Sequence, residues 1–172
     1  MLLQEVYHYK MAMPCKPNPS KSLSPGISPG TRAIIERKTG VDYKDPKDLP
    51  SKLNLSYCKD LVDVSALGGV RRLDLSWCAS VVDVSALGGV EHLNLTGCTS
   101  VVDVSALGGI RKLRLWGCTG VVDVSALGEV ETLVLSGCTG VVDVSSLGGV
   151  QTLILRGCTS ITDFSAVPRA HR

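Results

Sequence analysis

The sequence predicts a mostly β solenoid in which one short coil of chain is stacked on itself six times. Three observations support this fold class. From Lys52 onward the pattern LxLxxCxxVVDVSALGGV returns every 20 residues with few changes. Hydrophobic residues make up 44% of the 172 residues, whereas aromatic residues make up only 4%, so a core must be aliphatic. A unit this short can bury its apolar side chains only against its neighbours, which explains why the units are nearly identical.

The first 51 residues do not repeat, and we expect two segments there. Residues 1–30 are expected to form an arm, with a short strand in EVYHYKMAM and a linker rich in Pro, Ser and Gly. Residues 31–51 are expected to form an N-terminal cap. Its short helix would be capped by Ser28, begin near Pro29 and end at Gly40. Residues 52–168 then form the repeat domain, and residues 169–172 a tail.

Inside each unit, two leucines and one cysteine hold fixed positions. Because alternate strand residues share a face, both leucines are expected to point inward. In the fourth unit the core would be closed by four further residues. The inward residues of this unit are therefore Leu113, Leu115, Val121, Val124, Leu127 and Val130.

This pattern resembles the leucine-rich repeat family, whose signature is LxxLxLxxN/C in units of about 20 to 29 residues. The resemblance covers all six units, and DVSAL is similar to the DISPL turn of internalin-type repeats. Short repeat arrays of viral or protozoan type are a further, weaker resemblance. The family implies an α/β, mostly β fold: a right-handed coil with a parallel sheet on its concave face and short turns on its convex face. It implies no enzymatic reaction and no cofactor.

The repeated cysteines invite two interpretations. Stacked Cα atoms about 5 Å apart are within disulfide range, but parallel Cβ directions suit a disulfide poorly. Metal ligands converge on one point, whereas these thiols form a line with a spacing of 20 residues. The family resemblance implies a hydrogen bond to backbone at the strand exit. We therefore expect buried structural thiols and no metal, with metal or disulfide chemistry as the alternative.

Each unit also carries an aspartate at one position. The six are Asp63, Asp83, Asp103, Asp123, Asp143 and Asp163. We expect each carboxylate to accept hydrogen bonds from backbone N–H groups of the following turn, which would offset their mutual repulsion. A cation-binding ladder is the alternative.

The variable residues of the strands point away from the core, and stacking arranges them in columns. The first column begins Lys52, Arg72, His92 and Lys112. Like charges opposite one another on neighbouring strands are destabilising, so stability alone does not explain this column. The column beside it alternates in sign through Arg71, Glu91, Arg111 and Glu131, and so predicts cross-strand ion pairs.

Exposed aromatic residues and arginines complete a candidate binding face. Such residues dominate the energy of protein interfaces. The candidate residues are Lys52, Tyr57, Arg72, Trp77, His92, Lys112, Arg114, Trp116 and Arg156. The predicted function is a non-enzymatic scaffold that binds a protein partner, with an acidic segment of that partner on the concave face. The alternative for these positions is unconstrained drift.

Two other functions compete with this one. A last strand at Leu153–Leu155 left open would invite pairing with a second copy, and the N-terminal arm could be swapped into a homodimer. Nucleic-acid binding is less favoured, because the net charge is only +2. The sequence shows no export signal, membrane span or phosphate-binding loop, and its histidines are scattered, so we expect an intracellular protein with reduced thiols.

Overall fold

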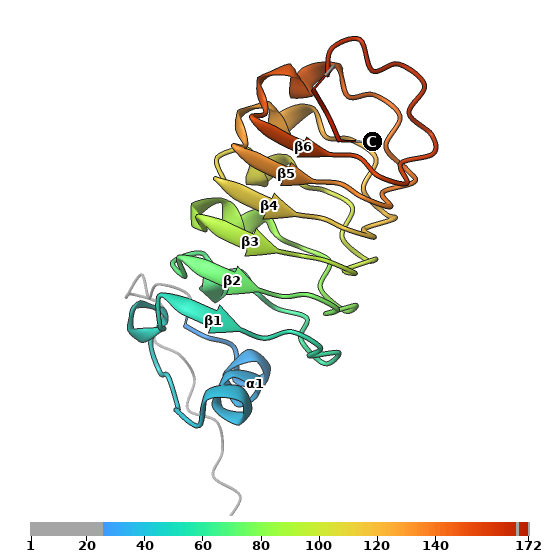
Figure 1. Cartoon of the computed structure of the whole chain (residues 1–172). Helices are drawn as coiled ribbons and strands as arrows, with labels where there is room; N and C mark the ends of the chain where they lie inside the picture. Colours follow the sequence, from blue (N-terminus) through green and yellow to red (C-terminus); the bar gives the residue numbers. More distant parts are fainter. Residues whose placement is uncertain (1–25, 168, 172) are drawn as a thin grey trace, which may run out of the picture.

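The computed structural model describes residues 26–167 and 169–171. Each 20-residue unit contributes one short strand to a single six-stranded parallel sheet, in the order of the chain (Figure 1). The strands are β1 (Lys52–Asn54), β2 (Arg72–Asp74), β3 (His92–Asn94), β4 (Lys112–Arg114), β5 (Thr132–Val134) and β6 (Thr152–Ile154). Each strand residue pairs with the residue 20 positions later. The expected solenoid of six stacked units with one parallel sheet is confirmed.

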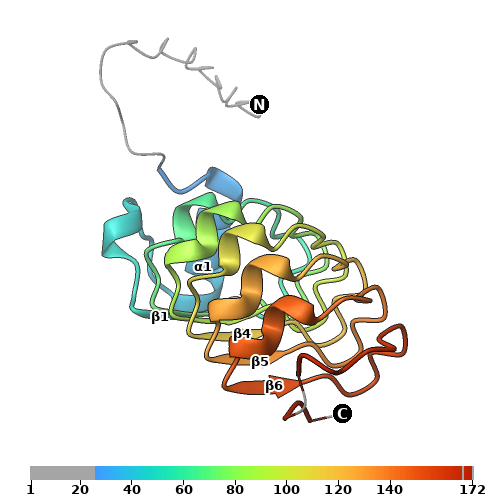
Figure 2. The ribbon, with the colours of Figure 1, turned by 90° about the horizontal axis from the view of Figure 1, so that it is seen from above.

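Short 3-10 helices return the chain to the next strand. They are η2 (Ser65–Leu67), η3 (Ser85–Gly89), η4 (Ser105–Leu107), η5 (Ser125–Glu129) and η6 (Ser145–Gly149). The view down the stack shows them on a different side of the coil from the strands (Figure 2). They pack so closely that a Cβ atom on Gly88 would lie 2.6 Å from the carbonyl oxygen of Ala106. This close approach explains why glycine follows the leucine of each SAL or SSL sequence.

The core is one continuous column of aliphatic side chains. In the fourth unit Leu113, Leu115 and Val121 are completely buried, as are Leu127 and Val130. Val124 is 2% exposed. The expected inward residues are therefore confirmed. Full burial of such side chains contributes roughly 1.5–3 kcal/mol each to folding. The first four units bury a residue at all six positions, whereas Val150 and Phe164 of the last two units are only partly buried.

The helix α1 (Pro29–Thr39) covers the first unit (Figure 1). It begins at Pro29 and ends at Gly40, whose left-handed φ of 74° lets its N–H bond to Glu36. Ser28 is the N-cap residue by its backbone, but the expected side-chain cap is wrong: the Ser28 hydroxyl donates to the Thr31 hydroxyl instead. Thr31 is in turn bonded to the backbone oxygen of Asp63, which ties the helix to the first repeat.

The rest of the N-terminal region is described only in part. A short 3-10 helix, η1 (Pro46–Asp48), follows α1, and the Asp45 side chain caps it by accepting the N–H of Lys47. The strand expected in residues 5–13, and most of the expected linker, lie outside the described residues. The division into arm, cap, repeat domain and tail stays a prediction. None of the described helices is long and apolar enough to span a membrane.

The last strand is not the open edge that the sequence predicted. His171 forms a parallel bridge with Ile154 of β6. Its N–H donates to the carbonyl of Leu153 at 2.9 Å, and its carbonyl accepts the N–H of Leu155 at 2.8 Å. The tail thus supplies part of the hydrogen bonding that a seventh strand would give. Because these backbone groups are already bonded to His171, they are not free to pair with a second copy of the chain.

Candidate partner-binding face

The structure places four basic residues side by side on the exposed face of the sheet. Lys52 pairs with Arg72, Arg72 with His92, and His92 with Lys112. We call these four residues the basic column. Lys52, Arg72 and Lys112 are exposed, and His92 is half-buried. Among the described residues, none of the four takes part in a salt bridge.

A hollow of about 420 Å³ lies on this face. The basic column lines one part of it, and Asn54, Asp74, Asn94 and Arg114 of the next outward-facing column line another. The buried leucines of the first three strands contribute to its floor. The hollow therefore combines five basic residues with side chains that can accept and donate hydrogen bonds.

The nearby carboxylates are engaged elsewhere. One oxygen of Asp74 accepts the N–H and the hydroxyl of Ser76, and the side-chain amide of Asn94. Glu91 bonds to Arg71 Nε at 2.8 Å. Neither carboxylate pairs with the basic column, so the positive charge of that column remains available to a ligand.

The residues just before the basic column alternate in charge along the stack, and they form the cross-strand ion pairs that the sequence predicted. Arg71 pairs with Glu91, and Arg111 pairs with Glu131 at 3.1 Å. These ion pairs connect neighbouring strands at the exposed rim of the sheet. Exposed pairs of this kind contribute on the order of 0.2–1 kcal/mol. This column therefore has a structural explanation that the basic column lacks.

His92 is the titratable member of the basic column. Burial lowers the pKa of His92 below its ordinary value, and the neighbouring Arg72 and Lys112 lower it further. The imidazole is therefore mainly neutral at pH 7 in the free protein. A carboxylate bound between these residues would favour the protonated form, because an opposite charge nearby raises a histidine pKa.

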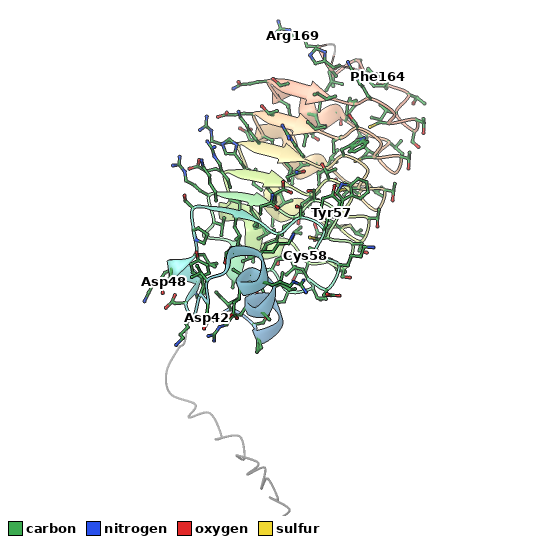
Figure 3. All side chains as sticks on the ribbon, turned by 60° about the horizontal axis from the view of Figure 1, so that its bottom comes forward. Asp42, Asp48, Tyr57, Cys58, Phe164 and Arg169 are labelled. Carbon is green, nitrogen blue, oxygen red and sulfur yellow. The ribbon has the colours of Figure 1, made fainter. Side chains whose placement is uncertain are left out.

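Three exposed aromatic residues form a cluster at the exit side of the sheet. Tyr57 and Trp77 are stacked, with ring centroids 6.4 Å apart, and Trp77 meets Trp116 edge to face at 6.2 Å. We call these three residues the aromatic cluster. They are 68%, 43% and 50% exposed, in that order. Figure 3 shows Tyr57 beyond the end of β1, on the side toward which the strands run.

Tyr57 and Trp77 occupy a strained backbone position. Both have φ of 62°, and among the described residues they are the non-glycine residues with positive φ. The equivalent positions of the other four units are Gly97, Gly117, Gly137 and Gly157, with φ of 71–73°. A bulky residue in this conformation costs about 1–3 kcal/mol. Aromatic side chains are thus exposed where the fold itself favours glycine.

The contact between Trp77 and Trp116 was not predicted from the sequence. Trp116 occupies the repeat position of Ser56, which is one residue before the position of Tyr57 and Trp77. It also lies in the fourth unit, two units after Trp77. The sequence feature that could have indicated this contact is Gly97, whose lack of a side chain leaves room for the Trp77 ring. A Cβ atom on Gly97 would lie 2.5 Å from that ring. Arg156, by contrast, lies in the sixth unit, away from both the aromatic cluster and the basic column.

The cysteines form a ladder of thiol hydrogen bonds inside the coil. From the second unit on, each thiol donates to the backbone carbonyl of the leucine 23 residues earlier, at 2.9–3.1 Å. Cys58 has no preceding unit, and its Sγ lies 3.8 Å from the carbonyl of Ser56. The expected backbone bonding is confirmed. Burial raises the pKa of Cys98, Cys118 and Cys138 to about 12, which suppresses thiolate chemistry.

The aspartates form the expected ladder of turn caps. Each accepts the backbone N–H of the serine two residues later at 2.8–2.9 Å. Hydrogen bonds from that serine lower the pKa of every one of these carboxyl groups. Within the described residues, no group of three or more His, Cys, Asp or Glu side chains is arranged to hold a metal ion.

Comparison with known structures finds internalin repeats. An internalin (inlF) from Listeria monocytogenes str. 4b F2365 is 19% identical over 59% of this chain and 43% of its own, with a TM-score of 0.39. An internalin C2 (inlC2) from the same strain is 22% identical over 69% and 55%, with a TM-score of 0.45. The functional domain of InlJ from Listeria monocytogenes, which includes a cysteine ladder, is 16% identical over 55% and 27%, with a TM-score of 0.35.

This chain thus spans from about a quarter to just over half of the length of these three structures. No family model and no curated protein matches the sequence.

Proposed function

We propose that this protein is a non-enzymatic scaffold that binds a partner protein on the exposed face of its sheet. The binding site comprises the basic column, Arg114 and the aromatic cluster. The ligand is an acidic segment of the partner. The fold supplies a rigid surface on which each strand presents one row of side chains, which suits recognition of an extended feature.

The basic column is the observation that carries this proposal. Four consecutive strands place Lys52, Arg72, His92 and Lys112 opposite one another, and within the described residues none of them forms a salt bridge with a carboxylate. In the last two strands, the same positions are Thr132 and Thr152, which the fold accommodates in the same register. Because the fold accepts threonine here, the charges are not needed for folding. A bound carboxylate segment would relieve their mutual repulsion.

The proposal is tested with a fluorescein-labelled peptide rich in glutamate, titrated with the protein and followed by fluorescence anisotropy. The variant Arg72→Ala/Lys112→Ala/Arg114→Ala removes three charges from the face. We expect it to weaken binding at least tenfold. The control variant Arg37→Ala/Lys44→Ala/Lys59→Ala removes three exposed charges elsewhere. It should change the affinity less than threefold, since it tests the net charge alone.

Two outcomes contradict the proposal. Equal losses in the two variants would mean that the peptide responds only to net charge. Tighter binding of a single-stranded oligonucleotide than of the peptide, with a steep loss in salt, would favour nucleic-acid binding instead.

A further inference from the structure

We infer that the acidic segment bound by this face is an amphipathic helix, with carboxylates along one side and an apolar anchor along the other. This inference rests on the proposed function and adds the conformation and the pattern of the ligand. It follows from three relationships between the basic column and the aromatic cluster.

The first relationship is the separation of the two features along the strands. The basic column lies at the start of each strand, and the aromatic cluster lies four to five residues further on. At about 3.3 Å per residue the separation is at most about 13–17 Å, because the strands end before the aromatic residues and the chain turns there. A helix with its side chains is about 10–12 Å wide. It fits between the two features with its acidic side toward the basic column and its apolar side toward the aromatic cluster, above the hollow.

The second relationship is the spacing across the strands. Neighbouring strands are about 4.8 Å apart, and a helix advances about 5.4 Å per turn. Each turn can therefore present one carboxylate to one strand, and the accumulated mismatch across β1–β4 is only about 2 Å. In an extended ligand, residues on the same side are about 6.6–6.8 Å apart. Over the three spacings from β1 to β4, their positions would differ from those of the strands by about 6 Å.

The third relationship is that both features end at the same unit. The basic column runs from Lys52 to Lys112 and has one member in each of the first four units. The aromatic cluster runs from Tyr57 to Trp116 and spans the same four units, with no member in the third. Three strand spacings are about 14 Å, which corresponds to about ten residues of helix. The ligand is thus a short helix of about three turns that crosses β1–β4.

The strained residues supply a test that preserves the fold. Because four units have glycine at the position of Tyr57 and Trp77, the variant Tyr57→Gly/Trp77→Gly places a favoured residue there. A purely structural role for these rings predicts a large loss of thermal stability. A binding role predicts that the melting temperature stays within about 5 °C while the apolar anchor is lost, since relief of strain offsets the lost ring contacts.

The probes are four synthetic peptides of 14 residues. The first has glutamates at a spacing of three and four residues and leucines on the opposite side. The second has the same composition with glutamate and leucine alternating, and the third is a scramble of that composition. The fourth has alanine in place of each leucine of the first. Affinities are measured by fluorescence anisotropy, and helix formation on binding by circular dichroism.

We expect the first peptide to bind wild-type protein at least tenfold more tightly than the second or third, and to gain helicity. Tyr57→Gly/Trp77→Gly should weaken the first peptide at least fivefold and change the fourth less than twofold. Equal affinities for the first three peptides would overturn the helix inference while leaving the proposed function intact. Selective binding that the glycine variant does not reduce would overturn the role of the aromatic cluster. Absence of binding by all four peptides would overturn both proposals.

Discussion

The thiol of Cys118 lies 3.0 Å from the carbonyl oxygen of Leu95, one unit back in the stack, and donates a hydrogen bond to it. Both residues are completely buried. This bond repeats from the second unit to the sixth, so each of these cysteines joins its own coil to the preceding one. The cysteine column is therefore part of the stacking of the solenoid.

The first prediction concerns this bond. Cys118→Ala should lower the free energy of unfolding by about 1–3 kcal/mol, because it leaves a small cavity and removes one of the two hydrogen bonds that the Leu95 carbonyl accepts. Cys58→Ala should cost less, since the Cys58 thiol is 3.8 Å from its nearest carbonyl partner. Urea denaturation of the two variants measures the difference. Equal losses would show that the thiol bond adds nothing beyond packing.

The second prediction concerns thiol reactivity. Burial raises the pKa of Cys118 to about 12, far above that of an unfolded thiol. A raised pKa stabilises the fold below the unfolded value, about 8.5, and this contribution is lost as the pH rises toward 12. At pH 8, iodoacetamide should modify Cys118 at least a hundredfold faster in urea than in the native protein, as followed by mass spectrometry. Similar rates in both conditions would contradict the burial of the ladder.

The third prediction concerns the aspartate ladder. Hydrogen bonds from Ser105 hold the pKa of Asp103 below its ordinary value. A lowered pKa means that this stabilisation is present above the unfolded pKa and is lost as the pH falls below about 4. Asp103→Ala should lower the melting temperature at pH 7, and this loss should shrink toward pH 2. Asp103→Asn keeps an acceptor for the Ser105 N–H and should be closer to wild type. A loss from Asp103→Ala that does not depend on pH would argue against the carboxylate cap.

The fourth prediction links binding to pH through His92. Its pKa is lowered in the free protein, and a bound carboxylate would raise it, so binding takes up a proton. The affinity for a glutamate-rich peptide should therefore increase as the pH falls from 8 to 5.5, while the glutamates remain ionised. Anisotropy titrations across this range measure the slope. His92→Gln should flatten it, and an unchanged slope in that variant would place the proton uptake elsewhere.

The repeating part of this protein could be predicted from the sequence almost completely. Identical residues at a spacing of 20 must pack against one another, so the burial of Leu113 and the capping by the aspartates could be inferred from one unit. The hydrogen bond from each cysteine to the backbone was implied by the resemblance to leucine-rich repeats. The register also placed the basic column correctly, because every unit has the same length.

The features that break the repeat could not be predicted in the same way. The bridge from His171 to Ile154 depends on the path of a tail that has no equivalent in the repeats. The contact between Trp77 and Trp116 runs diagonally across columns and depends on the space above Gly97. The hydroxyl of Ser28 bonds to a neighbouring side chain in place of the helix backbone. Each of these depends on side-chain positions that a periodic pattern does not encode.

The central claim is that the basic column is maintained for binding and not for folding. The most direct test is the dissociation constant of a glutamate-rich peptide for the variant Arg72→Thr, which places on β2 the residue that β5 and β6 already carry at this position. We predict a folded protein that binds at least fivefold more weakly than wild type. An affinity within twofold of wild type would contradict the claim, because the charge at the centre of the column would then have no part in recognition.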